Sequence, residues 1–451
     1  MNLWKNLKKP LYLCGALFIG SCSVDSELLD IKVTAEDLAL KEQLTELSGS
    51  LDFYILPESD DLENIPADPK NPLTAEKVLL GQLLFHETGL ATNAKLEANK
   101  GTYSCASCHH SAAGFQSGIK QGIGDGGSGF GLFGEARKLT ADYTAEMADV
   151  QPIKSPTVLN AAYQKVMLWN GQFGATGPNL GTESNWTPDT PKETNTLGFE
   201  GVETQAIAGL TVHRMSVTKE FLDDSGYTFL FDQAFPNLPE AERYTMTTTG
   251  LAIAAYERTL LANESNFQKW LKGSSNAMSI EEKKGAALFF GKANCYECHS
   301  GPALNSEAFY ALGLGDLAEP AVPILVDEAT KKGRGGFTKN PSDDYKFKVP
   351  QLYNLKDVNF FGHGGSLQSI KEIIVYKNRA VKESFDVSDE QLADQFIPLN
   401  LDLDEIEQLT QFVENSLQDK NLQRYEPSGL PTEMCFPNAD RQSKEDLNCD
   451  N

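Results

Sequence analysis

The apolar positions of this chain recur mostly at the spacing of α-helices, and strand-like alternation of polar and apolar residues is scarce. Thr74 is placed to cap a helix that continues to Phe85, with leucines repeated along one side. Residues 240–262 predict one long helix, and residues 402–417 predict an amphipathic helix with a continuous apolar stripe. The pattern therefore predicts a mainly α fold class.

The helical pattern that ends at Phe85 returns in the second half of the chain. Ser279 and Glu282 form a capping box at its start, and the segment again leads through Leu-Phe to a Cys-x-x-Cys-His sequence. Such repetition is typical of a duplicated domain. The polar stretch 272–276 interrupts the pattern, and 451 residues exceed what one compact core usually supports. We therefore predict two domains that meet near residue 272.

The strongest chemical signal is a Cys-x-x-Cys-His sequence that occurs twice. The first haem motif is Cys105, Cys108 and His109, and the second haem motif is Cys295, Cys298 and His299. This spacing places two thiols where they can add to the vinyl groups of a haem, while the adjacent histidine reaches the iron. A zinc site would need four ligands, and a thioredoxin-like pair would not need the histidine. The chain is therefore predicted to carry two covalently attached c-type haems, with both histidines as proximal iron ligands.

The N-terminus reads as an export signal. Three lysines precede an apolar run from Leu11 to Gly20 that is too short to span a bilayer. The following Ser21-Cys22 resembles the lipobox of bacterial lipoproteins, in which cleavage precedes the cysteine and lipid is attached to it. We expect a mature chain that begins at Cys22 and is lipid-anchored on the periplasmic side of a bacterial membrane. The alternative is an ordinary cysteine near the cleavage site of a soluble protein.

The charge of the chain restricts its partners. The formal charge is −24, and removing residues 1–21, which contain three lysines and no acidic residue, leaves −27. Such a surface argues against nucleic acid and against anionic membrane, and it favours a basic protein partner.

Two cysteines remain after the haem motifs and the N-terminal segment are assigned. In an exported protein, Cys435 and Cys449 are expected to form a disulfide. It would close a loop of about 15 residues and so raise the free energy of unfolding by about 3 kcal/mol. Two free thiols are the alternative.

Eight glycines crowd residues 118–134. Their spacing is too irregular for a dinucleotide fingerprint, and no predicted strand precedes them. We interpret this segment as a flexible loop over the first haem.

Four further stretches make the chain resemble the bacterial di-haem cytochrome c peroxidase family, which includes MauG-type proteins. They are Leu84-Phe85, residues 155–161 with Trp169-Asn170-Gly171, residues 347–354 and residues 361–366. Together with the two haem motifs, which occur in the expected order, the resemblance spans residues 72–425. It implies two cytochrome c-like domains, with a peroxide-binding haem in the first and an electron-accepting haem in the second.

With this resemblance, the chain divides into five predicted parts. Residues 1–21 are a lipoprotein signal peptide, and residues 22–71 are an acidic tether punctuated by prolines. Residues 72–271 form the N-terminal cytochrome c-like domain, with the peroxidatic haem. Residues 272–430 form the C-terminal cytochrome c-like domain, with the electron-transfer haem. Residues 431–451 form a tail that contains the expected disulfide.

The resemblance also implies roles for residues around the first haem. Trp169 matches a tryptophan that lies between the haems and could assist electron transfer, although a core tryptophan is the alternative. Gln205 matches a family position, but the family's acid/base glutamate is missing. His213 is the candidate acid/base in its place, and Arg214 a candidate to stabilise charge on the departing oxygen. Iron ligation or a structural role are the alternatives for His213.

The sixth ligand of the second haem is a methionine or tyrosine in the family. Counted from His363, that position falls at Lys377, with Tyr376 beside it, on a helix capped by Ser369 and Glu372. We expect Tyr376 to bind the iron, because a lysine ligand needs a strongly depressed pKa; Lys377 is the alternative. His363 is expected to contact a propionate or the backbone.

The function expected from these features is an exported di-haem peroxidase that reduces hydrogen peroxide to water, taking electrons from a small donor protein such as a cytochrome. The alternatives are a MauG-type oxidase of a protein or organic substrate, and a non-enzymatic electron-transfer cytochrome. The family also holds a calcium ion between its domains, with Asn160 in a matching segment, and it includes homodimers.

Overall fold

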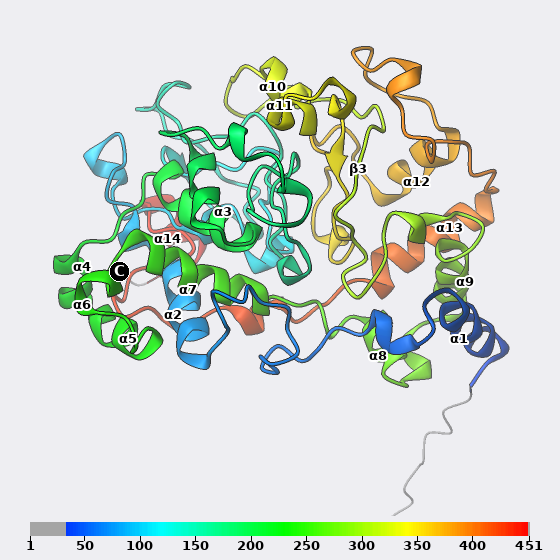
Figure 1. Ribbon diagram of the computed structural model, residues 1–451, viewed down its shortest axis with the longest axis horizontal. Coiled ribbons are helices and arrows are strands. Elements are labelled where there is room, and N and C mark those ends of the chain that lie inside the picture. Colours follow the sequence, from blue (N-terminus) through cyan, green and yellow to red (C-terminus); the bar gives the residue numbers. More distant parts are fainter. Residues whose placement is uncertain (1–32, 450–451) are drawn as a thin grey trace, which may run out of the picture.

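The computed structural model describes residues 33–449, and its helices gather in two groups that lie side by side (Figure 1). The first group contains α2 (Ala75–His86), α3 (Gly201–Val212), α4 (Lys219–Ser225), α5 (Tyr227–Ala234), α6 (Glu240–Arg243), α7 (Met246–Thr259) and α14 (Arg441–Asp446). The second group contains α1 (Ala35–Ser48), α8 (Asn266–Leu271), α9 (Ile280–Phe289), α12 (Ile370–Arg379) and α13 (Leu403–Gln411). No helix within residues 33–449 is long and apolar enough to cross a membrane.

The remaining regular elements are short. Two short helices lie between residues 310 and 347, α10 (Glu328–Lys331) and α11 (Arg334–Thr338). β1 (Gly127–Ser128) pairs antiparallel with β2 (Lys138–Leu139), and β3 (Phe309–Tyr310) pairs antiparallel with β4 (Phe347–Lys348). The prediction of a mainly α protein is therefore confirmed. The predicted signal peptide and Cys22 lie outside the described residues.

The helix starts predicted from capping residues are present. The Thr74 side chain accepts from the Lys77 N–H at the start of α2, and Ser279 does the same for Glu282 at the start of α9. Ser369 and Asp402 cap α12 and α13 in the same way. Each cap satisfies a backbone donor that the helix itself leaves without a partner.

Each helix group is built around one close helix crossing. α2 crosses α7 at Gly81, where an added Cβ would lie 1.9 Å from the Ala252 carbonyl oxygen. α9 crosses α13 at Gly285, where an added Cβ would lie 2.0 Å from the Gln408 carbonyl oxygen. Both glycines stand four residues before a buried phenylalanine of the same helix, Phe85 or Phe289. The same packing device therefore precedes both haem motifs.

The long helix predicted over residues 240–262 is wrong. The segment forms α6 and α7, with Tyr244 and Thr245 between them. The Thr245 side chain accepts from the Thr248 N–H and starts a new helix in a reciprocal capping box. The spacing of apolar residues continues across Tyr244 and Thr245, so it does not show that the helix is interrupted there.

The prediction of an acidic tether over residues 22–71 is also wrong for residues 33–71, the part that the structure describes. α1 buries Leu40 and Leu44 in the core. Its Asp37 carboxylate is buried, pairs with the Lys283 ammonium at 2.8 Å and accepts from the Trp270 indole N–H at 2.6 Å. Burial alone would raise the pKa of Asp37, but these two bonds outweigh burial and lower that pKa to about 2. This segment therefore packs as part of the second helix group.

The C-terminal segment docks on the first helix group. Cys435 and Cys449 form a disulfide with a Cα–Cα distance of 6.0 Å, as the sequence predicts. The hydroxyls of Ser104 and Ser107, on either side of the first haem-motif cysteine, donate to the Pro437 carbonyl at 2.9 and 3.1 Å. The segment therefore covers the first haem motif instead of extending from the protein.

The same segment holds the glycine-rich loop. The Asp440 carboxylate accepts from the Ser128 hydroxyl and the Gly129 N–H, and the Asp446 carboxylate accepts from the Phe130 N–H at 2.8 Å. Most of residues 121–130 are buried. A flexible loop does not fit these contacts, so that interpretation is corrected.

Replacing Gly81 or Gly285 by alanine should lower the free energy of unfolding by about 1–3 kcal/mol, because the new methyl group meets backbone that cannot move aside. Urea unfolding of the full chain measures the loss. Gly429→Ala is the matched control, since no atom lies within 4 Å of an added Cβ there. Equal midpoints for G81A and G429A would contradict the close crossing.

Replacing both Cys435 and Cys449 by serine should lower the free energy of unfolding by about 3 kcal/mol, because the closed loop restricts the unfolded chain. Urea unfolding of the double variant measures this loss. Alkylation without reductant, followed by mass spectrometry, is the control for pairing. Labelling of both cysteines in the folded parent protein would show that the disulfide is absent.

Candidate active site

The first haem motif lies on a short 3-10 turn over residues 105–107. The ring Nδ1 of His109 faces the Phe115 carbonyl oxygen at 3.4 Å, so this nitrogen carries the ring proton. Burial lowers the pKa of His109 to about 4, with a smaller contribution from His213. The imidazole is therefore neutral, and its Nε2 lone pair is free to bind a metal.

The second haem motif repeats this arrangement. Residues 295–297 form a 3-10 turn, and the Nδ1 proton of His299 is directed at the carbonyl oxygens of Leu304 and Pro350, both at 3.1 Å. Burial lowers the pKa of His299 to about 4. Two main-chain carbonyls thus fix the tautomer that leaves Nε2 available.

The four motif cysteines are unpaired, unlike Cys435 and Cys449. Burial raises the pKa of Cys105, Cys108 and Cys295 to about 12, so these side chains are neutral thiols. Each motif therefore offers two thiols and one neutral imidazole.

A cavity of about 530 Å³ opens at the second haem motif. Its wall includes Cys295, Cys298 and His299, and on the far side residues of the first half of the chain, among them Pro156, Thr157 and Trp169. Its size falls in the range of about 300–1,000 Å³ that is usual for ligand cavities.

Trp169 lines this cavity and is held by hydrogen bonds to two other segments of the chain. Its indole N–H donates to the Lys154 carbonyl at 2.8 Å, and its own carbonyl accepts from the Lys348 N–H at 2.8 Å. Residue Ser155 follows Lys154 and reaches the first motif, since an added Cβ on Gly122 would touch both Ser155 and Cys108 at 2.8 Å. A short stretch of chain therefore connects the first motif to Trp169 and the second cavity.

Two buried lysines flank Trp169 and border the same cavity. Lys154 donates to the Gln116 amide oxygen at 2.5 Å, and Lys348 donates to the Gln164 amide oxygen. Burial lowers the pKa of Lys154 to about 7 and that of Lys348 to about 8. Neither ammonium has a carboxylate within ion-pair distance in the described part of the chain. Buried cations of this kind normally require an anion.

One face of α3 lies near the first motif. Gln205, Gly209 and His213 follow at four-residue intervals, and an added Cβ on Gly209 would lie 3.5 Å from the Gln205 amide nitrogen and 3.9 Å from the His213 ring. The Gln205 amide oxygen is buried and has no hydrogen-bond partner among residues 33–449. A buried ion pair at 2.7 Å between Glu203 and Arg258 holds α3 against α7.

His213 is paired with a carboxylate. Its Nδ1 donates to Asp149 Oδ2 at 2.8 Å, and 38% of the His213 side chain is exposed, against 5% for Asp149. Burial opposes charge on the imidazole, but the Asp149 carboxylate outweighs it, so the pKa of His213 lies above its usual value. This bond leaves Nε2 as the nitrogen that can take up a proton.

Arg214 is bound on one side. Its Nη1 forms an ion pair with the Asp125 carboxylate and donates to the Met147 carbonyl at 2.7 Å. Asp125 also accepts from the Tyr143 hydroxyl at 2.5 Å. The role of Arg214 in stabilising the departing oxygen stays a prediction.

The two candidate ligands on α12 lie in different surroundings. The Tyr376 hydroxyl donates to the Leu312 carbonyl at 2.6 Å. Lys377 forms no hydrogen bond or ion pair with any residue from 33 to 449, and its Nζ lies 5.3 Å from the centre of the Phe396 ring. Tyr376 as an iron ligand stays a prediction, but the structure gives its hydroxyl another partner.

His363 borders the second cavity and stacks on Phe347, with ring centres 3.7 Å apart. Its Nε2 lies 3.2 Å from Asp316 Oδ1, and its carbonyl accepts from the Lys154 N–H at 2.9 Å. The ring nitrogen thus faces a carboxylate, and the expected contact of His363 with a propionate or the backbone stays a prediction.

Comparison with known proteins identifies the chain's relatives. A family model described as di-haem cytochrome c peroxidase matches residues 75–276. Cytochrome-c peroxidase IdrP1 of Denitromonas iodatirespirans is 28% identical over 398 residues, which cover 84% of this chain and 91% of that protein. Methylamine utilization protein MauG of Methylorubrum extorquens is 28% identical, over 69% of this chain and 71% of its own.

The family model and these relatives show that the chain is similar to di-haem cytochrome c peroxidases. The crystal structure of a MauG-like protein associated with microbial copper homeostasis supports the fold, with a TM-score of 0.55 and 22% identity over 82% of this chain and 95% of that one. The diheme peroxidase BthA from Burkholderia thailandensis has a TM-score of 0.51 and 15% identity, over 80% of this chain and 90% of its own.

The residues of this chain fit the two haems that its similarity to the family implies. Each motif combines unpaired thiols with a neutral imidazole whose Nδ1 is already bonded. At the second motif, the cavity has room for a large ligand, and Lys154 and Lys348 offer buried cations that suit the carboxylates of haem. On α3, the unpartnered Gln205 amide oxygen marks a polar site that residues 33–449 do not satisfy.

Several residues of this site escaped the sequence analysis. Asp149 gives no sequence signal, because it stands 64 positions before its partner His213. Lys154 directly precedes one segment that carries the resemblance and Lys348 lies within another, yet nothing in the sequence shows that they are buried. Glu257 lies on α7 within electrostatic reach of Cys105, and burial raises its pKa to about 8.

The calcium ion stays a prediction. The Asn160 side-chain oxygen accepts from the Ala262 N–H at 3.0 Å, and its amide nitrogen faces Gln351 Oε1 at 3.4 Å. Between residues 33 and 449, no group of three or more His, Cys, Asp or Glu side chains is placed to hold a metal ion.

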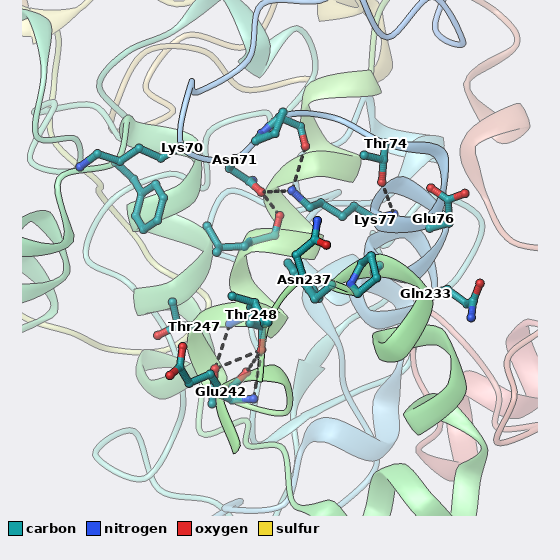
Figure 2. Close-up of a pocket in the computed structure, with 18 of the residues that line it drawn as sticks. Lys70, Asn71, Thr74, Glu76, Lys77, Gln233, Asn237, Glu242, Thr247 and Thr248 are labelled. Atoms are coloured by element: carbon teal, nitrogen blue, oxygen red, sulfur yellow. Dashed lines mark hydrogen bonds between the residues drawn. The ribbon is translucent and has the colours of Figure 1, made fainter. Parts of the chain in front are cut away.

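A larger cavity, of about 730 Å³, lies between the start of α2 and the segment from α5 to α7 (Figure 2). Its polar groups largely satisfy one another: Lys77 Nζ donates to Asn71 Oδ1 at 3.1 Å, and Asn71 Nδ2 donates to the Leu251 carbonyl at 3.0 Å. No cysteine or histidine lines it, so it offers no haem attachment.

Proposed function

We propose that this protein is a di-haem peroxidase that reduces hydrogen peroxide to water, with electrons from a small redox donor such as a cytochrome. The observation that carries the proposal is the presence of two complete haem motifs in a chain similar to this family, with Trp169 in the wall of the cavity at the second motif. The family relatives that are named cytochrome c peroxidases support the same reaction.

We further propose that the haems are attached covalently, through Cys105 and Cys108 in the domain of residues 72–271 and through Cys295 and Cys298 in the domain of residues 272–430. The neutral thiols of both motifs support this attachment. When bound, the haems supply iron that can exchange the two electrons of peroxide reduction. Export and a lipid anchor at Cys22 complete the proposal and rest on the N-terminal sequence alone.

His213 and Asp149 carry the proton transfer in this proposal. His213 takes a proton from peroxide at Nε2 and returns it to the departing oxygen, while Asp149 holds the Nδ1 proton at 2.8 Å and stabilises the charged ring. Gln205, on the same face of α3, offers an amide to position peroxide. The pair thus takes the place of a glutamate.

Trp169 is the proposed connection for electrons between the two sites. Its indole is fixed by a hydrogen bond to Lys154, and the stretch that follows Lys154 reaches the first motif. A large aromatic ring held in one orientation suits this role.

A MauG-type oxidase is the second candidate function. Relatives named MauG and a MauG-like structural neighbour favour it, as does His213 at the place of the expected glutamate. Such an oxidase would use peroxide to oxidise a protein or organic substrate in place of a reduced donor.

Turnover of hydrogen peroxide by the purified full-length protein distinguishes these functions. We expect peroxide consumption that depends on a reduced small cytochrome, with two donor electrons used per peroxide. A peroxide-sensitive electrode and the absorbance of the donor follow both reactants, and heat-denatured protein is the control. Turnover that needs an organic substrate and no donor would support the oxidase. Absence of both reactions would overturn the proposal.

The proton-transfer pair predicts a pH dependence. The base form of His213 must be neutral, so kcat/KM for peroxide should rise with pH through the pKa of His213, which lies above the usual 6.5. Asp149→Asn removes the charge that raises this pKa and should move the rise to lower pH. His213→Gln should lower kcat/KM by about 10²–10⁴-fold.

Asp142→Asn is the matched control, because Asp142 is an exposed carboxylate of the same segment. It should leave the pH profile unchanged. A profile that is identical in D149N and the parent protein would show that Asp149 does not set the protonation of the catalytic group.

A further inference from the structure

Five lysines border the cavity at the second haem motif. Lys292 and Lys331 form ion pairs with carboxylates, and the other three differ in what they bind. Lys154 and Lys348 each donate to a side-chain amide, whereas Lys377 has no hydrogen-bond or ion-pair partner within residues 33–449. The Lys377 side chain is half-buried against the Phe396 ring, at 5.3 Å from Nζ to the ring centre. A half-buried ammonium with no partner is costly unless a ligand completes its surroundings.

The three lysines also have different neighbours. The backbones of Lys154 and Lys348 are both hydrogen-bonded to Trp169. Lys377 lines the same cavity as Cys295, Cys298 and His299. Because the ammonium groups of Lys154 and Lys348 already donate to side-chain amides, Lys377 is, within the described part of the chain, the one of the three whose nitrogen is free to bind a ligand.

The neighbouring tyrosine is already engaged. Consecutive residues of an α-helix point about 100° apart, so Tyr376 and Lys377 cannot both face one point above the haem. The Tyr376 hydroxyl donates to the Leu312 carbonyl at 2.6 Å, and its ring packs on Phe396 with centres 5.3 Å apart. Bringing the tyrosine oxygen to the iron would break this buried hydrogen bond.

We propose that Lys377 would supply, besides His299, a second protein ligand to the iron of a haem bound at the second motif. The Lys377 ammonium gives one proton to solvent, its nitrogen lone pair forms the bond to iron, and no electron is transferred. The inference rests on the proposed haem at the second motif and is independent of peroxide reduction at the first.

An amine ligand has consequences for the second haem. It closes this iron to peroxide and cyanide, so that only the first site can take part in peroxide chemistry. A methionine ligand raises the reduction potential of a c-type haem, and a nitrogen ligand does not. The second haem should therefore have a lower potential than its counterpart would have with methionine.

Electron paramagnetic resonance and near-infrared magnetic circular dichroism of the ferric, full-length protein with both haems attached test the proposal. The parent protein should show one low-spin haem with the signature of histidine–amine ligation. Tyr376→Phe should keep it. Lys377→Arg keeps the charge but cannot bind iron, so this low-spin signal should be lost and a cyanide-binding haem should appear.

Lys377→Met should restore a low-spin haem with the charge-transfer band of methionine ligation and a higher reduction potential. Lys371→Met, an exposed lysine of the same helix, is the matched control and should change nothing. Retention of the parent signal in K377R, or its loss in Y376F, would overturn the proposal. A tyrosinate or methionine signature in the parent protein would also overturn the proposal. Peroxide turnover is measured separately and would still test the proposed function.

Discussion

Both candidate haem sites depend on one hydrogen bond, from the Nδ1 proton of the motif histidine to a main-chain carbonyl. His109 makes it to Phe115, and His299 makes it to Leu304 and Pro350. Without this bond a buried imidazole could present either nitrogen, and a ligand of fixed direction would not exist. The turns that carry the cysteines, the helix that precedes each motif and the loop that supplies the carbonyl all serve to hold this geometry.

Charge is distributed unevenly around these two sites. The chain is strongly acidic as a whole, with a formal charge of −24, yet the cavity of the second motif is bordered by buried or half-buried lysines. Near the first motif the pattern is reversed, because the carboxylates of Asp149 and Asp125 pair with His213 and Arg214. One site is therefore arranged to receive negative charge, and the other is arranged to move protons. This difference fits a division between an electron-accepting site and a peroxide site.

The sequence allowed the helical class, the caps and both motifs to be predicted, because each depends on residues that are close together in the chain. Thr74 and Ser279 reveal helix starts through a partner three positions away. The pairs Asp149–His213 and Asp37–Lys283 were not predictable, because they join distant segments whose approach depends on tertiary packing. The prediction of a tether was wrong for the same reason, because an acidic composition does not show that Leu40 and Leu44 pack in the core.

The docking of the C-terminal segment on the first motif has a consequence for the order of assembly. The Pro437 carbonyl, which accepts from the hydroxyls of Ser104 and Ser107, stands 333 and 330 positions after these serines and is therefore made much later. The first motif stays uncovered on this side until that segment has been made and has docked. A segment made late thus closes a site whose cysteines were made early, so that a chain cut short before Pro437 would leave this site uncovered.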